Sequence, residues 1–279
     1  MYELVSSLDR SWIALLGLLA LRIGAVLLFT PVLYAVQMPF TARVLVTFGL
    51  ACILATALLP TAAARGFSTL GGLVGAALSE LALGITLAVG VHAAFAAFAV
   101  AGRVLDVQIG FATAQILDPM TQRAQPVVTS ILGLAAVLVF FLTDTHHLLI
   151  RGLASTVERY PVGEHWPIGN AVDPIVRQVG VTFALGFALV APVVLCLLLT
   201  EAALGVLSRS LPQMNMFALG LPVRIIVGLL AVSLWWAAAP SVFLRIYETI
   251  FRTWERMLIA QADAPLLRMA PRLPSWGIS

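Results

Sequence analysis

Charged residues divide this chain into long apolar segments. Six runs of 20 or more residues contain no Asp, Glu, Lys or Arg. A helix of about 20 apolar residues crosses the hydrocarbon core of a bilayer. The runs show no alternation of period two, so the pattern favours helices over a membrane barrel. The six predicted helical segments are 23–42, 44–64, 81–102, 124–143, 178–200 and 225–244.

Two of these segments do not fit a simple straight span. Residues 66–102 form a 37-residue stretch with Glu80 as its one charge, which predicts either one over-long helix or a short helix followed by a span. Pro31 and Pro39 interrupt the run 23–42. Broken backbone is tolerated inside a membrane only where protein or water covers it. We therefore expect broken or re-entrant segments packed inside a helical multi-subunit assembly.

The remaining segments are expected to form connections and a tail. The polar stretches 103–123, 144–177 and 201–224 separate the apolar runs. The pattern predicts a membrane domain over 1–244 and an amphipathic helix with a C-terminal tail over 245–279. One apolar face of that helix comprises Leu244, Tyr247, Phe251, Trp254 and Leu258.

Composition supports the membrane class. Apolar residues make up 61% of the 279 residues, charged residues make up 10%, and the mean hydropathy is +1.03. A soluble domain carries about 25% charged residues, so a soluble enzyme is excluded. All 16 basic residues are Arg and they are scattered, which argues against nucleic-acid binding. We expect membrane lipid as a partner and no nucleic acid.

Four polar residues are candidates for buried positions. Carboxylates inside a membrane indicate a proton or ion path, and Glu80 is the best candidate, with a contact at an interface or between subunits as the alternative. Asp106 follows Arg103 by three residues, the spacing of a helix-neighbour pair. Adjacent helical residues point about 100° apart, so His146 and His147 are expected to form a polar helix end capped by Asp144. We predict no metal site and no cofactor.

Small residues recur every fourth position at Gly71, Gly75 and Ser79. This spacing lets helices approach closely in an apolar medium, where hydrophobic attraction between them is absent. The contact is either internal to the chain or made with neighbouring subunits.

Two short segments have unusual composition. The first lies between Asp106 and Pro119 and predicts either a re-entrant turn or a loop that places Phe111 in a lumen. The second, bracketed by Pro212 and Pro222, predicts either a kinked connector that meets a partner or a plain loop. The first segment comprises Gly110, Phe111, Ala112, Thr113, Ala114 and Gln115, and the second includes Gln213, Met214, Asn215 and Phe217.

Several motifs together resemble the FliR/SctT family, the single-copy subunit of the flagellar and type III secretion export gate. The central and Pro-Gln segments are more similar to flagellar members than to injectisome members. The family often has Gly where this chain has Thr145. The motifs are Arg22-Ile23-Gly24 with Pro31, the stretch 106–119, the stretch 144–149, Tyr160-Pro161-Val162-Gly163, and Pro212 to Phe217 with Gly220 and Pro222.

The resemblance implies a non-enzymatic part of a closed channel for unfolded export substrates. The implied location is the bacterial inner membrane at the flagellar basal body. The implied partners are about five FliP-type subunits, about four FliQ-type subunits and a FlhB-type switch protein. It also implies a plug loop over Gly110–Gln115, with Phe111 as its bulky seal.

Two other functions remain open at this point. A proton-coupled secondary transporter would use Glu80 or Glu201. An intramembrane enzyme would be built on His146 and His147, although the sequence supplies no clear third ligand or nucleophile.

Overall fold

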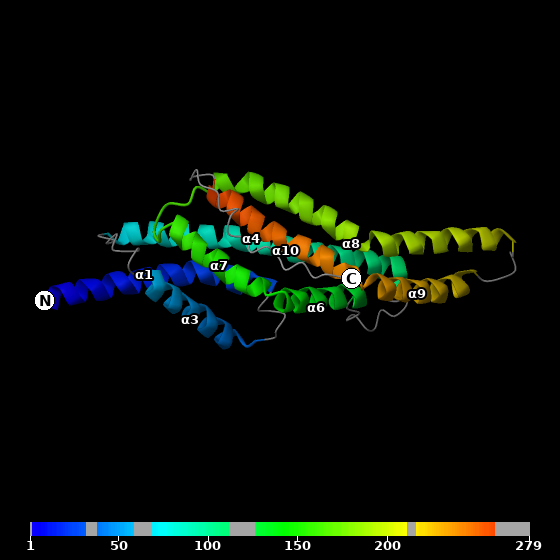
Figure 1. The fold of residues 1–279 in the computed structure, drawn as a ribbon, viewed down its shortest axis with the longest axis horizontal. Coiled ribbons are helices and arrows are strands. Elements are labelled where there is room, and N and C mark those ends of the chain that lie inside the picture. Colours follow the sequence, from blue (N-terminus) through cyan, green and yellow to red (C-terminus); the bar gives the residue numbers. More distant parts are fainter. Residues whose placement is uncertain (1, 32–37, 59–68, 112–125, 211–215, 260–279) are drawn as a thin grey trace, which may run out of the picture.

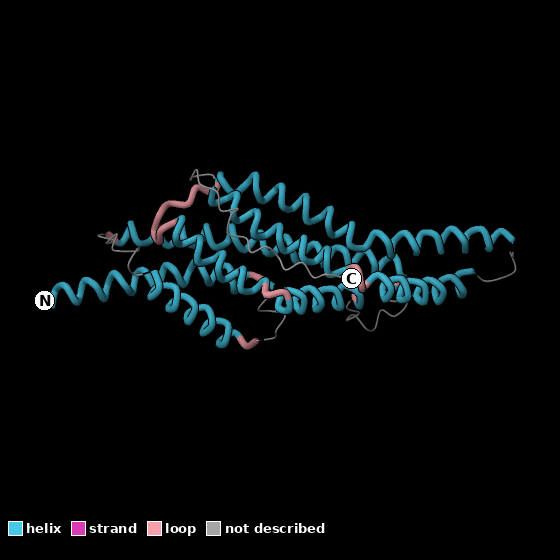
Figure 2. Tube along the Cα trace, in the orientation of Figure 1, coloured by secondary structure: helices cyan, strands magenta, loops and turns pink. Residues whose placement is uncertain are grey.

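A computed structural model describes residues 2–31, 38–58, 69–111, 126–210 and 216–259. Every regular element in these ranges is a helix, which confirms the all-α class. Figure 2 shows the helices joined by short loops within the described part. The helices are α1 (Tyr2–Phe29), α3 (Phe40–Leu58), α4 (Leu70–Ile109), α6 (Val127–Leu142), α7 (Thr145–Arg159), α8 (Gly169–Ser210), α9 (Met216–Trp235) and α10 (Ala239–Ile259).

Two of the predicted segments are divided between helices, because helix breaks and charges do not coincide. The division of 23–42 agrees with the interruption predicted from its prolines, whereas the division of 225–244 was not predicted. The run 23–42 straddles a break, since α1 ends at Phe29 and α3 begins at Phe40. Proline lacks a backbone N–H and clashes with the preceding turn, so Pro31 and Pro39 fall outside both helices. The run 225–244 is divided in the same way, between α9 and α10. Its break at 236–238 contains no proline and no charge.

The long apolar stretch resolves into a single helix. Helix α4 has 40 residues, which at 1.5 Å per residue makes it about 60 Å long, twice the thickness of a hydrocarbon core. It packs against α1, α6, α8, α9 and α10 and therefore forms the axis of the bundle (Figure 1).

The polar stretches predicted as connections are largely helical. Residues 103–109 continue α4, residues 145–159 form α7, and residues 201–210 continue α8. Helix α7 ends at Arg159, and residues 160–168 form the connection to α8. Charged residues are therefore no guide to where these helices stop.

Length and composition identify the helices that can cross a membrane. Two helices, α4 and α8, qualify alone. The pairs α6–α7 and α9–α10 each qualify together and are each bent by 70°, which brings the number of spans in the described ranges to as many as four. Helices α1 and α3 contribute shorter apolar segments. The polytopic character and the broken segments agree with the prediction from sequence.

The core contains a cluster of aromatic rings contributed by α4, α6 and α10. The centroids of Phe98 and Phe243 lie 4.6 Å apart, and those of Phe140 and Tyr247 lie 5.4 Å apart in an edge-on arrangement. Phe95 packs against three of these rings. Edge-to-face and tilted ring pairs are favourable beyond the area that they bury.

Helix α10 is amphipathic, as predicted, and three residues of the predicted face, Tyr247, Trp254 and Leu258, are buried, whereas Leu244 is not. It begins at Ala239, so the boundary expected after residue 244 lies within it. Leu244 is 36% exposed, whereas Phe243 and Ile250 are almost fully buried. The centre of the apolar face therefore lies to one side of Leu244, and this face packs on α4, α7 and α8.

The outer surface is strongly apolar over α3, α8 and α9. Large side chains such as Leu45, Leu199 and Leu234 are more than 60% exposed. Soluble monomers rarely expose contiguous apolar surface of this extent. The exterior is therefore suited to lipid or to other apolar subunits.

Candidate functional site

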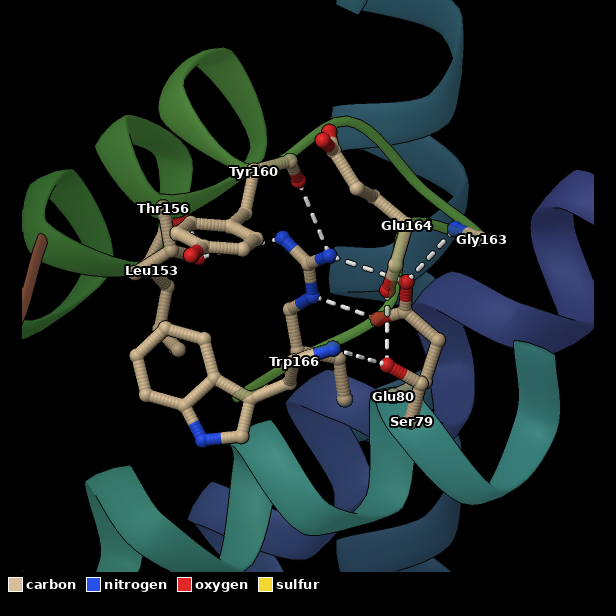
Figure 3. A network of polar contacts seen from close by, with 9 residues as sticks. Ser79, Glu80, Leu153, Thr156, Tyr160, Gly163, Glu164 and Trp166 are labelled. Atoms are coloured by element: carbon tan, nitrogen blue, oxygen red, sulfur yellow. Dashed lines mark hydrogen bonds and ion pairs between the residues drawn. The ribbon is translucent and has the colours of Figure 1, made fainter. Parts of the chain in front are cut away.

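A buried ion pair joins α1 to α4. The Arg22 guanidinium donates from Nε to Glu80 Oε2 at 2.5 Å and from an Nη to Glu80 Oε1 at 2.9 Å (Figure 3). Each side chain is only 1% exposed. A two-pronged contact of this kind is the strongest form of Arg–carboxylate pair.

The rest of the hydrogen-bonding capacity of the pair is filled by α7 and the segment that follows it. The Gly163 backbone N–H donates to Glu80 Oε1 at 2.8 Å. Arg22 also donates to the Tyr160 carbonyl at 3.0 Å and to the Thr156 hydroxyl at 3.5 Å. Buried charges are stable only when such additional bonds satisfy them, so this network meets the requirement.

A second set of contacts holds the same connection beside Glu80. The Ser79 hydroxyl donates to the Glu164 carbonyl at 2.6 Å and accepts from the Trp166 backbone N–H at 2.7 Å (Figure 3). The rings of Tyr160 and Trp166 pack edge to face at 4.8 Å. Burial, with a further contribution from Glu164, raises the pKa of the Tyr160 phenol. The ion pair and its surroundings therefore fasten α1, α4, α7 and residues 160–166 together.

Two glycines make this arrangement possible. Gly163 has φ = 87°, a conformation that suits a residue without a Cβ, and it turns its N–H toward Glu80. A Cβ on Gly84 would lie 2.6 Å from the Ala25 Cβ and 2.7 Å from the Arg22 carbonyl oxygen. Glycine at 84 therefore lets α1 and α4 approach closely enough for the ion pair to form.

The contacts of Glu80 favour a structural role over proton transfer. A relay carboxylate needs access to water or to a second relay group, whereas both oxygens of Glu80 are held by Arg22 or Gly163 and the side chain is buried. The expected contact at an interface or between subunits is also wrong, because the partner is Arg22 of the same chain. The sequence carries one signal of this pair: Arg22 is a lone charge beside a long apolar stretch, and Glu80 is a lone charge within one.

Asp106 has a different role from the one predicted. Its carboxylate accepts from the backbone N–H groups of Val128 and Thr129 at 2.9 and 3.0 Å, and from the Thr129 hydroxyl at 2.6 Å. Asp106, which lies on α4, therefore caps the start of α6. The N-cap residue of α6 is Pro126, whose side chain has no hydrogen-bond acceptor for these N–H groups. Within the described ranges Arg103 is exposed and forms no ion pair with Asp106, so the predicted helix-neighbour pair is wrong.

Removing this cap is expected to weaken the junction between α4 and α6. In Asp106→Ala, one buried N–H group, one partly buried N–H group and one hydroxyl lose a charged acceptor, which predicts a loss of about 2 kcal/mol in the free energy of unfolding. Reversible unfolding of the detergent-solubilised chain measures this loss. Asp173→Ala is the matched control, because Asp173 is 72% exposed and forms an exposed pair with Arg177. Equal losses in the two variants would contradict the capping role.

The histidine pair lies at the bend between α6 and α7. Asp144 occupies the N-cap position of α7 with φ = 55°, and its side chain makes no capping bond to the backbone. Instead, its carboxylate lies 3.3 Å from His147 Nδ1. The rings of His146 and His147 lie 4.1 Å apart. The expectation that these two side chains diverge is therefore wrong.

The remaining predicted residues are only partly described. Helix α4 ends at Ile109, its C-cap Gly110 has φ = 100°, and Phe111 packs against the core with its side chain partly buried. Gly71 and Gly75 are exposed, and a Cβ on either would meet nothing within 4 Å. Phe217 lies in the first turn of α9. Ala112, Thr113, Ala114, Gln115, Gln213, Met214 and Asn215 lie outside the described residues.

A second ion pair joins the two helices α8 and α9. Glu201 contacts Arg224, with side chains that are 39% and 30% exposed. The partner of Glu201 comes from the adjacent helix, so this carboxylate is also paired within the chain. Both carboxylates considered for proton coupling, Glu80 and Glu201, therefore have an arginine partner.

The fold and these contacts define a polytopic helical membrane protein held together by buried polar pairs. A model of the family described as "Bacterial export proteins, family 1" matches residues 13–250. The chain belongs to this family of bacterial export proteins.

Three relatives illustrate the range of the family. The flagellar biosynthetic protein FliR of Pectobacterium carotovorum is 30% identical over 174 residues, which are 62% of this chain and 67% of the relative. FliR of Escherichia coli is 28% identical over 230 residues, covering 82% of this chain and 87% of the relative. The Yop proteins translocation protein T of Yersinia pestis is 27% identical over 188 residues, covering 65% and 71%.

Proposed function

We propose that this chain is a FliR-type subunit of the flagellar export gate, the channel through which unfolded substrates cross the bacterial inner membrane. The observation that carries the proposal is the family match over residues 13–250, together with flagellar relatives that align over most of their length. FliR of Escherichia coli aligns over 82% of this chain and 87% of its own length, whereas the type III translocation relative aligns over 65% and 71%. The flagellar system is therefore favoured over the injectisome.

The exterior of the chain supports a role as one part of a larger wall. Apolar side chains cover the outer faces of α3, α8 and α9, and α4 is about twice as long as a bilayer core requires. Such a helix extends beyond the hydrocarbon region, where its apolar surface needs protein neighbours. The proposed neighbours are several FliP-type and FliQ-type subunits, with a FlhB-type switch protein on the closed gate.

The proposed role involves no catalysis. The chain would contribute a passive wall and a seal to the channel. An apolar constriction blocks ions by dewetting and needs no fixed charge. We assign the seal to the segment 110–115, with Phe111 as its bulky residue. Left-handed Gly110 ends the rigid helix α4 immediately before Phe111, which supports a change of chain direction at this point.

Removing the seal is expected to make the closed gate leak. Phe111→Ala takes away the only large apolar side chain of the segment 110–115, so water and ions should enter the constriction and conductance should rise several-fold. Single-channel recording of the assembled complex in a planar bilayer measures the effect. Phe187→Ala, on the exposed face of α8, is the control. Unchanged conductance in correctly assembled Phe111→Ala complexes would remove the plug assignment.

The composition of the native complex tests the proposal as a whole. Purification of the tagged chain in mild detergent should recover one copy together with several FliP-type and FliQ-type subunits. A chain that purifies alone and carries out solute uptake in liposomes would instead support the secondary transporter. That alternative has little support, because Glu80 and Glu201 are each paired with an arginine.

A further inference from the structure

We infer that Asp144, His146 and His147 form a binding site for a divalent transition metal of the zinc type at the bend between α6 and α7. One ligand atom from each of the three residues lies within 4.8 Å of the other two. Imidazole nitrogen and carboxylate oxygen are the donors that Zn²⁺ accepts in open three-ligand sites, with water in the fourth position. The inference concerns a site separate from the proposed plug and does not depend on the export function.

One of the ligand distances already matches a bound metal. His147 Nδ1 and Asp144 Oδ1 lie 3.3 Å apart. Two ligands held at about 2.0–2.1 Å from a tetrahedral Zn²⁺ are separated by about 3.3 Å. A metal ion can therefore bind between these two atoms with little movement of either side chain.

His146 supplies the independent observation that points to a ligand. Its Nδ1 atom is enclosed by the protein and has no hydrogen-bond partner. A buried polar atom without a partner is unfavourable. The ring lies between two others, with Phe141 at 5.2 Å and His147 at 4.1 Å. The orientation of His146 is therefore restrained, and one of its ring nitrogens belongs to the cluster of three donors.

The backbone at the bend explains why the three donors converge. Asp144 is the one non-glycine residue with positive φ in the described ranges, and such a conformation is rare outside special turns. Its neighbours are tied together, because the hydroxyls of Thr143 and Thr145 lie 2.8 Å apart. This turn brings the Asp144 carboxylate alongside the first turn of α7, where both histidines begin.

Solvent reaches the site directly. The side chains of Asp144 and His147 are 74% and 62% exposed, so a metal can enter without opening the bundle. A bound ion would connect the turn to the first residues of α7 and would stabilise the 70° angle between α6 and α7.

Zinc titration of the full chain tests the inference. The protein is purified in detergent without a histidine tag and titrated with ZnCl₂ by calorimetry, and Co²⁺ absorption reports the ligand geometry. We expect one Zn²⁺ per chain, and affinity lowered at least ten-fold in both His147→Gln and Asp144→Asn. His92→Gln and His165→Gln are the matched controls, because both are exposed histidines away from the bend, and they should bind as the unmodified chain does.

Two results would overturn the site. One is Zn²⁺ binding that is absent, or equally strong in His147→Gln and in the unmodified chain. The other is binding lost in His92→Gln or His165→Gln, which would place the ion elsewhere. Because bound ligand stabilises the native state, Zn²⁺ should also raise the Tm of the unmodified chain but not that of His147→Gln. Circular dichroism of the variants in the absence of metal establishes that they are folded.

Discussion

Glu80→Ala is expected to lower the free energy of unfolding by about 3–5 kcal/mol, because it leaves the Arg22 guanidinium buried without its counter-charge. Arg22 is 1% exposed and sits where α1 and α4 are in close contact, so it cannot reach water without separating the helices. Gly163 also loses the acceptor for its N–H. Unfolding of the solubilised chain and the yield of assembled complex both measure the loss. Glu248→Ala is the control, since Glu248 forms an exposed pair with Arg252 and such pairs contribute little.

The double variant Arg22→Met with Glu80→Met separates a structural role from proton transfer. Replacing a buried ion pair with apolar side chains of similar size is often neutral or stabilising, so the double variant should recover most of the stability lost in Glu80→Ala. A folded double variant that still supports export would agree with the structural role. A folded double variant that assembles but loses all transport would contradict it, because only the chemistry of the carboxylate would then be missing.

Gly102→Val is expected to separate α4 from α6 and to cost about 3 kcal/mol, at the upper end of overpacking effects. A Cβ at this position would lie 2.4 Å from the Thr129 Cα, which is backbone and cannot move aside alone. Thr129 also donates to Asp106, so displacing α6 would break its cap as well. Thermal unfolding of the solubilised chain measures the loss.

The matched control for this variant is Gly75→Val, made on the same helix. A Cβ on Gly75 meets no atom within 4 Å, so the stability of the isolated chain should change by less than about 0.5 kcal/mol. Equal destabilisation by the two substitutions would show that helix propensity, and not the close approach at Gly102, determines the effect.

The glycines show where spacing in the sequence does and does not predict packing. The four-residue repeat of Gly71, Gly75 and Ser79 suggests a tight helix contact, yet Gly71 and Gly75 face open space in this chain. Close approaches to the backbone of a neighbouring helix occur at Gly84, Gly102 and Gly186, where a Cβ would lie less than 3.0 Å from a backbone atom. A repeat identifies small residues, but only the crossing points of the helices decide which of them are needed.

The polar residues give a related result. Glu80 and Asp106 were recognisable as candidates because they stand in apolar surroundings, but their partners were not. Arg22 is 58 positions from Glu80, and the groups that Asp106 caps are 22 and 23 positions away. No local pattern encodes contacts over such separations. The approach of Asp144 to His147 could not be predicted from sequence for a different reason: it depends on the positive φ of Asp144, which immediately precedes α7.

The amino-acid sequence by itself determined the all-α membrane class, the long apolar segments and the similarity to a bacterial export family, because these depend on composition, periodicity and short motifs. It did not determine where several helices begin and end. That depends on which charges find a buried partner, and α1 and α4 continue through Arg22 and Glu80 because each satisfies the other. Only the tertiary structure decides such pairings, since the free energy of a buried charge depends on the groups that surround it in space.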